Sequence, residues 1–566
     1  MDAGKKTIGD IFNRTRILEI PFFQRSYVWN NEQWERMLED MENVCLTNKP
    51  YFLGSVILKQ QPTNTNYKIG DVRTVIDGQQ RLTTLSILFK VLCLKLNQNQ
   101  LFEGTFKTIS DDITLQHNHN DVESFTKILS LNHLDEIKDN NKIVAAYNFF
   151  KEKLNPDKVD FYKILSNVLF VGIDLGENED EQQIFDTINS LGVTLTTAEL
   201  LKNYFFNRDI NSYNKFWKEI FEKDEETKNY WDREITAGRL KRTFIDLFFF
   251  SYLQIKIQEK SLNVKTEDKI EFSRVEQLFE SYKKFIKDYL HNEKAGILSE
   301  IKEYAKIFKD NFDIEITDRE LAANAGIERI NVVIFGLDNS TLIPYVLYIL
   351  KNISDDNIKN KLFEYLETYI MRRMVVHANT KNYNQLFTDR LIINEILSVE
   401  QLSEHIEKLS DKINYMPTDE DLWDRGFNTA ILINKQAAGI LYLIETKIRK
   451  NNLHSTKLLG LNKYSLEHIM PKKWENNWGI IEDENEKRNR DRKLLTLGNL
   501  TIITQPLNSK IRDANWDDKK EKGLKLFSAD LETLNTYLQL IEWNETTIGL
   551  RAENLYEKAK TIWKIS

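Results

Sequence analysis

The sequence predicts an α+β fold that is predominantly helical. Only 8 of the 566 residues are proline and 20 are glycine, so long irregular loops should be few. Strand-like runs occur near the N-terminus, whereas the middle of the chain shows one helical pattern after another. The chain is too long for a single hydrophobic core. We therefore predict three domains, at residues 1–206, 207–410 and 411–566.

The composition is typical of a globular protein, with 41% hydrophobic and 29% charged residues. No window approaches the roughly 18 uninterrupted apolar residues of a membrane span, and residues 1–6 lack the apolar core of a signal peptide. Cys45 and Cys93 lie in apolar helical patterns, which indicates buried thiols and a cytoplasmic location. Because the net charge is −8, any nucleic-acid contact must come from local basic patches.

Short-range patterns predict the N-terminal elements in order. Residues 20–29 are typical of a strand and turn, residues 31–45 of an amphipathic helix, and residues 52–58 of a buried strand. Residues 111–142 are polar and contain His117, His119 and His133, which could indicate a metal site. Because no cysteine or carboxylate cluster accompanies these histidines, a solvated loop is the favoured interpretation. The later elements that we predict are a strand at 169–175, helices at 181–190, 200–206, 216–221, 244–255, 275–289, 341–350 and 362–376, and a helical segment at 422–444.

The most informative stretch is residues 74–85, with the sequence TVIDGQQRLTTL. It predicts a strand, a tight turn and a helix. Asp77 and Gly78 form the turn, and Gln79 and Gln80 precede Arg81. Unpaired backbone N–H groups and a guanidinium at a helix N-terminus favour an anion, for which a phosphate is the obvious candidate. The alternative is a plain strand–turn–helix, since Asp-Gly is a common turn dipeptide.

A second constellation lies near the C-terminus. Its segments are SLEHIMP at 465–471, LGNLTII at 497–503 and PLNSK at 506–510. His468 could take a proton from an attacking water, and Glu467 with the amide oxygen of Asn508 could bind a hard divalent cation. Asn499 could hold a turn or orient the histidine. The alternative is a buried histidine with two structural asparagines.

A dense basic run, KRNRDRK, occupies residues 487–493 between these segments. Such a run is either a solvated helix face or a contact for nucleic acid. The C-terminal region, which starts near residue 445, holds five of the ten tryptophans, and these either belong to the core or stack on bases. These are Trp474, Trp478, Trp516, Trp543 and Trp563.

Both constellations resemble those of one family, the GmrSD-type restriction endonucleases. The N-terminal segments PFFQRSYVW, FLGS, IDGQQRLTTL and FDTINSLGVTL are similar to its ParB-like domain. The C-terminal segments EHIMP, GNL and LNS are similar to its HNH nuclease domain. The resemblance covers both ends of the chain, while the helical middle carries few distinctive motifs.

The resemblance implies an NTP-regulated, modification-dependent (type IV) DNA endonuclease in defence against phage. Its N-terminal ParB-like α/β domain would bind and hydrolyse GTP, ATP or UTP and would sense modified phage DNA. The nucleotide-binding residues carried over from the family are Asp77, Gly78, Gln79, Gln80 and Arg81, with Gln24 and Arg25 opposite.

For the C-terminal domain, the resemblance implies a ββα-metal HNH fold that cuts DNA. His468 would be the general base and would form the catalytic set with Asn499 and Asn508. Glu467 and Asn508 would bind Mg²⁺ or Mn²⁺, and Asn499 would support the hairpin. No membrane partner is expected, and a homodimer is one open arrangement. Two rival functions remain: a nucleotide-gated DNA-binding switch without nuclease activity, and an RNA-cleaving toxin.

Overall fold

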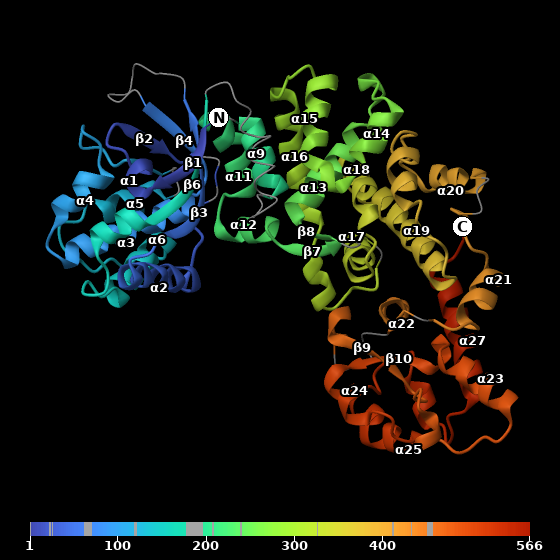
Figure 1. Ribbon diagram of the computed structural model, residues 1–566. Helices are drawn as coiled ribbons and strands as arrows, with labels where there is room; N and C mark the ends of the chain where they lie inside the picture. The colour runs from blue at the N-terminus through green and yellow to red at the C-terminus, as the bar shows by residue number, and fades with distance from the viewer. Residues whose placement is uncertain are drawn as a thin grey trace. The chain divides into compact units, whose positions relative to one another are not determined.

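The computed structural model forms two compact units, Met1–Trp217 and Lys218–Ser566 (Figure 1). It is an α+β protein in which helices predominate, as the sequence predicts. The residues that the structure describes are 2–21, 24, 26–61, 71–117, 121–176, 196–206, 209–237, 240–324, 326–409, 413–431, 433–449 and 457–565. The predicted helix at 181–190 and the FDTINSLGVTL segment lie outside them. The finer division into three domains stays a prediction.

The described residues of the N-terminal unit form a mixed six-stranded sheet in the order β1–β6–β3–β4–β2–β5. The strands are β1 (Asp2–Thr7), β2 (Arg16–Glu19), β3 (Tyr51–Gln60), β4 (Asp71–Asp77), β5 (Leu115–Gln116) and β6 (Val168–Leu175). Parallel pairs join β3 to β6 and β2 to both β4 and β5, whereas β4 runs antiparallel to β3 and β1 antiparallel to β6.

Helices bury one face of this sheet. They are α1 (Ile8–Ile11), α2 (Asn31–Thr47), α3 (Gln79–Lys95), α4 (Asn99–Phe106), α5 (Val122–Leu129), α6 (Lys142–Lys153) and α7 (Phe161–Asn167). On the other face, Leu200 of α9 (Thr197–Phe206) packs against Ile57, Ile76 and Leu175. The unit ends with α10 (Ile210–Tyr213) and a π-helical turn. Thr196 and Glu199 exchange hydrogen bonds and form a capping box before α9.

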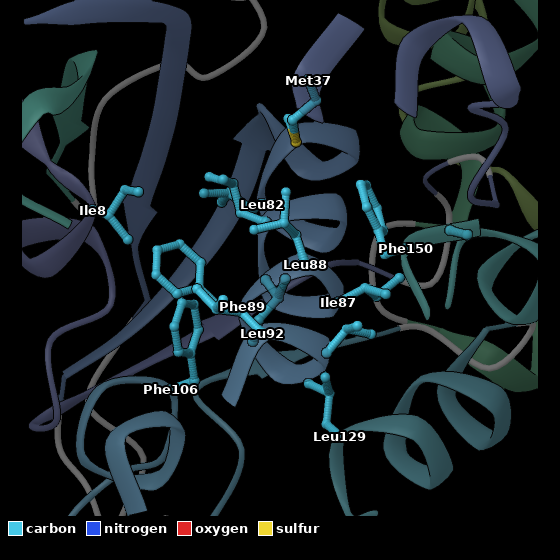
Figure 2. Packing of buried hydrophobic residues seen from close by; sticks show 14 of the residues in the cluster. Ile8, Met37, Leu82, Ile87, Leu88, Phe89, Leu92, Phe106, Leu129 and Phe150 are labelled. Carbon is cyan, nitrogen blue, oxygen red and sulfur yellow. The ribbon is translucent and has the colours of Figure 1, made fainter. Parts of the chain in front are cut away.

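Helix α3 lies at the centre of the N-terminal unit. Apart from Arg81, every residue from Gln80 to Leu94 is buried, which confirms the prediction of a helix covered on nearly all sides. Figure 2 shows Leu82, Ile87, Leu88, Phe89 and Leu92 of this helix among side chains from several other elements. Strand β4 therefore delivers the chain directly into the core through the turn at residue 78.

Two N-terminal predictions are wrong in part. The strand expected at residues 20–29 ends at Glu19 instead, because Pro21 has no N–H for the sheet ladder. The polar segment 111–142 is not only loop, since it contains β5 and α5, whose apolar side chains join the core. His117 is only 3% exposed and is not solvated, whereas His119 lies outside the described residues.

The first part of the C-terminal unit is mainly helical. Its elements are α11 (Glu219–Phe221), α12 (Glu225–Trp231), β7 (Glu234–Ala237), β8 (Leu240–Thr243), α13 (Phe244–Lys256), α14 (Thr266–Phe272), α15 (Leu278–Tyr289), α16 (Ala295–Asn311), α17 (Ile327–Asn331), α18 (Ile343–Asn352), α19 (Asp356–Val375), α20 (Val399–Lys408) and α21 (Asp419–Asp421). The β7–β8 hairpin was not predicted. Within the described chain, no helix combines the length and apolar character that a membrane crossing requires.

The second part carries the EHIMP segment. Its elements are α22 (Asn434–Ile448), β9 (Tyr464–His468), α23 (Glu484–Leu494), β10 (Leu500–Thr504), α24 (Gln505–Ile511), α25 (Trp516–Lys519), α26 (Lys525–Phe527) and α27 (Glu545–Ile562). The single helical segment expected at 422–444 is wrong. A π-helical turn (Leu422–Phe427) ends where the Thr429 hydroxyl donates to the Asp424 carbonyl, and α22 starts afresh.

Helix α27 completes the core around β9 and β10. A Cβ on Gly498 would lie 2.1 Å from the carbonyl oxygen of Ile548 in α27, so only glycine allows this approach. The fully buried guanidinium of Arg551, also in α27, donates to the carbonyls of Gly498 and Leu500 at 2.8 and 2.7 Å. The start of β10 is thus held by main-chain contacts and by one buried arginine.

Truncation of a core residue in α3 should destabilise the N-terminal unit. Leu88→Ala removes a side chain with 0% exposure and should lower the free energy of unfolding by about 2–5 kcal/mol. Leu46→Ala, at an 86% exposed position of α2, is the matched control and should change it by less than about 0.5 kcal/mol. Hydrogen exchange of α3 peptides in increasing urea measures both. Equal exchange in the two variants would contradict the central role of α3.

Candidate nucleotide and phosphodiesterase sites

The turn between β4 and α3 requires a glycine. Gly78 is the N-cap residue of α3 and has a φ of +97°, which side-chain-bearing residues rarely adopt. A Cβ there would lie 2.9 Å from Val56 Cγ2 and 3.1 Å from the Ser55 carbonyl oxygen. No side chain caps the helix, and its first helical hydrogen bond runs from Leu82 N to Gly78 O. The N–H groups of the first turn therefore point out of the helix end, as an anion site requires.

Arg81 and Asp77 form a part-buried pair beside this turn. Arg81 Nη2 donates to the Ser55 carbonyl at 2.9 Å and lies 3.2 Å from Asp77 Oδ2, which also accepts from Ser55 Oγ at 2.8 Å. The other guanidinium nitrogen, Nη1, lies against Gly54, where a Cβ would be 2.5 Å away. Arg81 Nε is buried and has no hydrogen-bond partner among the described residues. The guanidinium is held in place while keeping an unsatisfied donor.

The side chains of Gln24 and Gln80 face the protein. Gln24 Nε2 donates to the carbonyls of Val75 and Ile76 at 2.7 and 3.1 Å. Gln80 Oε1 accepts from Val28 N at 2.9 Å, and Gln80 Nε2 donates to Ser26 O at 3.3 Å. These amides tie the segment before α2 to β4 and α3. Of the other predicted residues, Gln79 is half-buried and Arg25 lies outside the described residues.

A directional chain of hydrogen bonds lies directly below the turn. The Thr84 hydroxyl donates to the Gln80 carbonyl at 2.7 Å, so its lone pair accepts from the Tyr27 hydroxyl at 2.6 Å. Trp34 Nε1 in turn donates to the Tyr27 oxygen at 2.8 Å. Because each donor has one acceptor, the positions of the protons are fixed along the chain. Burial raises the pKa of Tyr27 and keeps the phenol neutral.

His117 belongs to the same buried region. The Thr83 hydroxyl donates to the Gln79 carbonyl at 2.8 Å and must therefore accept from His117 Nε2 at 2.7 Å. This places the imidazole proton on Nε2 and leaves Nδ1 buried, 3.9 Å from Asp121 Oδ2. Burial lowers the pKa of His117 to about 3, so the ring is neutral at ordinary pH.

A cleft of the N-terminal unit lies elsewhere. It has a volume of about 820 Å³ and is lined mainly by the end of α2 and by residues 156–163. None of the predicted nucleotide residues lines it.

In the C-terminal unit, the EHIMP segment lies on a hairpin followed by a helix. Strands β9 and β10 are antiparallel, and His468 lies opposite Leu500. Helix α24 begins directly after β10, with Pro506 in its first turn, and packs against both strands. The three predicted segments thus meet in one strand–strand–helix arrangement.

Asn499 holds the chain that leaves β9. Its Oδ1 accepts from Met470 N at 2.9 Å and from Trp543 Nε1 at 3.0 Å. Its Nδ2 donates to the carbonyls of Met470 and Leu494 at 2.9 and 3.0 Å. Since the side chain is fully buried and every polar position is used, Asn499 supports the hairpin and does not face a substrate.

Asn508 reaches β9 from α24. Its Nδ2 donates to Ser465 Oγ and to the Leu466 carbonyl, both at 3.1 Å. These two bonds orient the half-buried amide. Within the described part of the chain, the structure records no hydrogen bond to Asn508 Oδ1, so that oxygen is open to a ligand.

Glu467 and His468 have different surroundings. The Glu467 carboxylate is buried and pairs with the ammonium of Lys519, and Lys519 Nζ also donates to the His468 carbonyl at 2.9 Å. Burial raises the pKa of Glu467, although Lys519 opposes this. Burial, with help from Lys472 and Lys519, lowers the pKa of His468 to about 4. The half-buried imidazole is therefore neutral near pH 7, the form in which it can accept a proton.

The basic run lies on α23 and is partly engaged within the protein. Arg490 pairs with Glu545 and lies over the Trp474 ring at 4.7 Å, and Lys493 donates to Asn428. Four of the five tryptophans are buried, so base stacking is wrong for them. These are Trp474, Trp516, Trp543 and Trp563. Trp478 is half-buried and donates to the Ala514 carbonyl.

Two family models match this chain. Residues 8–206 match the GmrSD restriction endonuclease N-terminal domain, and residues 416–558 match the GmrSD restriction endonuclease C-terminal domain. The chain belongs to the GmrSD restriction endonuclease family. This GmrSD protein is therefore a nuclease that belongs to a defensive restriction system. It hydrolyses phosphodiester bonds, and its substrate is DNA. No curated protein matches the chain.

The sequence identified the GmrSD motifs but missed their buried partners. Lys519 was not predicted, because Trp516 to Lys520 contains four charged residues in five and is typical of a surface turn. The helical spacing did contain a signal for burial. Lys519 and Lys520 lie three and four residues after Trp516, so they share the helix face on which Trp516 packs into the core. The partnership of Thr83 with His117 spans 34 residues and left no local signal.

The buried His117 should make the N-terminal unit acid-sensitive. Its pKa of about 3 lies below the unfolded value of 6.5, so the unfolded chain binds more protons between those pH values. The free energy of unfolding should therefore fall as pH decreases below 6.5, by at most about 1.4 kcal/mol per pH unit from this residue. His117→Gln, which keeps an N–H donor, should flatten that dependence.

Urea unfolding between pH 5 and 7.5, followed by hydrogen exchange of α3, measures the effect. His133→Gln, at an exposed position of the same unit, is the control and should retain the wild-type slope. An equally steep slope in His117→Gln would show that another group is responsible.

Proposed function

We propose that this chain is an NTP-regulated, modification-dependent DNA endonuclease that cuts at the β9–β10–α24 segment. The observation that carries the proposal is the neutral, half-buried imidazole of His468 on a hairpin whose following helix presents Asn508. In an HNH-type reaction, a ring nitrogen of His468 takes the proton of the water that attacks phosphorus. Asn499 keeps the exit of β9 in place, so that the imidazole stays oriented.

A divalent cation fits the donor chemistry of this segment. Glu467 and the amide oxygen of Asn508 would hold Mg²⁺ or Mn²⁺, which both prefer oxygen ligands. The Glu467 carboxylate already takes one positive charge, that of Lys519, and Asn508 Oδ1 is open. When bound, the ion would stabilise negative charge on the cleaved phosphate. Among the described residues, no cluster of three His, Cys, Asp or Glu side chains offers a rival site.

The N-terminal turn is the proposed nucleotide site, for GTP, ATP or UTP. The first-turn N–H groups of α3 and the guanidinium of Arg81 would bind phosphate oxygens. The unsatisfied, buried Nε of Arg81 supports this, since such a donor gains most from an anionic partner. Asp77 pairs with Arg81 and would orient its guanidinium toward the phosphates. Gly78 lets the backbone approach the ligand, with Gln79, Gln80, Gln24 and Arg25 around it.

The remaining parts of the proposal rest on the family. The N-terminal unit would sense modified phage DNA and would couple nucleotide turnover to cutting through the helical middle, with a homodimer as one possible assembly. We place the protein in the cytoplasm, an inference that the two buried, free cysteines support.

Loss of the general base should abolish cutting. His468→Ala should lower the cleavage rate by about 10²–10⁴-fold, because the attacking water loses its proton acceptor. Nicking of modified plasmid DNA with Mg²⁺ and each nucleotide measures the rate. His133→Ala, an exposed histidine of the N-terminal unit, is the matched control.

Cleavage that is equal in wild type and His468→Ala under every nucleotide condition would overturn the nuclease assignment for this hairpin. Nucleotide-dependent DNA binding without cutting would then favour the DNA-binding switch. Cleavage of total RNA with modified DNA left intact would favour the toxin.

Removal of either charge at the N-terminal turn should stop nucleotide hydrolysis. Asp77→Ala and Arg81→Ala should each abolish turnover and leave the chain folded, because both side chains are only part-buried. Release of inorganic phosphate measures turnover, and circular dichroism checks the fold. Lys107→Ala removes a comparable ion pair, 3.0 Å from Asp111, and should keep full turnover. Unchanged hydrolysis in both test variants would refute the site.

A further inference from the structure

The ammonium group of a buried lysine, Lys519, lies beside the EHIMP segment. Lys519, the last residue of α25, has a side chain with 0% exposure, and its ammonium pairs with Glu467 Oε1. The same Nζ donates to the carbonyl oxygen of His468 at 2.9 Å. One ammonium therefore bridges two consecutive residues of the EHIMP segment.

This ammonium holds the carboxylate that the proposed metal would use. A carboxylate buried this deeply needs a cationic partner, and Lys519 supplies it in the absence of any ion. A divalent cation on Glu467 would stand next to the ammonium, and two like charges on one buried carboxylate repel strongly. The two cations must therefore compete.

The neighbouring lysine shows that this arrangement is specific to residue 519. Lys520 is also buried, yet its ammonium bonds Asp517 at 3.1 Å and the Leu540 carbonyl at 3.2 Å. It also lies over the ring of Trp516. Its charge serves the packing of this turn and has no recorded contact with Glu467 or His468.

We propose that Lys519 is a positioning residue that competes with the divalent cation for Glu467 and so lowers the metal affinity of the site. The proposal rests on the metal-dependent function proposed above. Without metal, Lys519 keeps Glu467 neutralised and fixes the end of β9 through the His468 carbonyl. The site is thus assembled before an ion arrives, and an ion on Glu467 would have to share the carboxylate with this ammonium or displace it.

Direct metal binding to the full-length protein tests this without any cleavage assay. Mn²⁺ is titrated into wild type, Lys519→Met, Lys520→Met and Glu467→Gln, and free Mn²⁺ is measured by electron paramagnetic resonance. Lys519→Met keeps the length of the side chain but removes its charge, and should bind Mn²⁺ at least about tenfold more tightly than wild type. Lys520→Met should match wild type.

Two further variants keep the result interpretable. The double variant Lys519→Met with Glu467→Gln should lose the gain, which assigns it to the carboxylate. Lys519→Gln retains a donor for the His468 carbonyl and serves if Lys519→Met does not fold, as judged by thermal unfolding.

The outcomes separate the two proposals. Binding that depends on Glu467 but is unchanged or weaker in the Lys519 variants overturns the competition and leaves the metal site standing. Binding that is the same with and without Glu467, in both lysine backgrounds, overturns the metal site and the competition with it.

Discussion

A polar group that is buried away from water must find its partner within the chain, and both candidate sites depend on this constraint. In the N-terminal unit, α3 is packed so closely that Thr83 and Thr84 in its first turns have no contact with solvent. Thr83 and Thr84 therefore bond back to the carbonyls of Gln79 and Gln80 and recruit His117 and a tyrosine. The shape of the turn at the proposed nucleotide site is thus determined from inside the core.

The C-terminal unit meets the same constraint with arginines. Arg372 and Arg373 in α19 are both fully buried. Arg373 donates to three main-chain carbonyls, including that of Tyr415, and Arg372 donates to the carbonyl of Trp563. Arg329 bonds both oxygens of Glu367 in the same core. Arg372 and Arg373 hold loops in place, and Arg329 joins α19 to α22. On a surface, the same residues would bind an anion.

Elements that are determined by residues close together in the sequence could be predicted from the sequence alone. The sequence predicted a strand, a tight turn and a helix at residues 74–85, and the structure confirms all three. It also identified the family from two motifs. It failed where a distant residue decides: His117 was taken for loop although Thr83 lies 34 residues away, and Lys519 reaches Glu467 across 52 residues. Sequence spacing does not show which of two distant residues will meet.

The place of α27 in the chain has a consequence for synthesis. The helix follows, in chain order, every element that it packs against, including the turn at Gly498 and the start of β10. Arg551 satisfies the carbonyls of that turn, and nothing earlier in the described chain takes its place. A nascent chain on the ribosome therefore exposes an unfinished hairpin until α27 emerges. The nuclease site is therefore incomplete, and the cell is not exposed to its activity, during most of the synthesis of the chain.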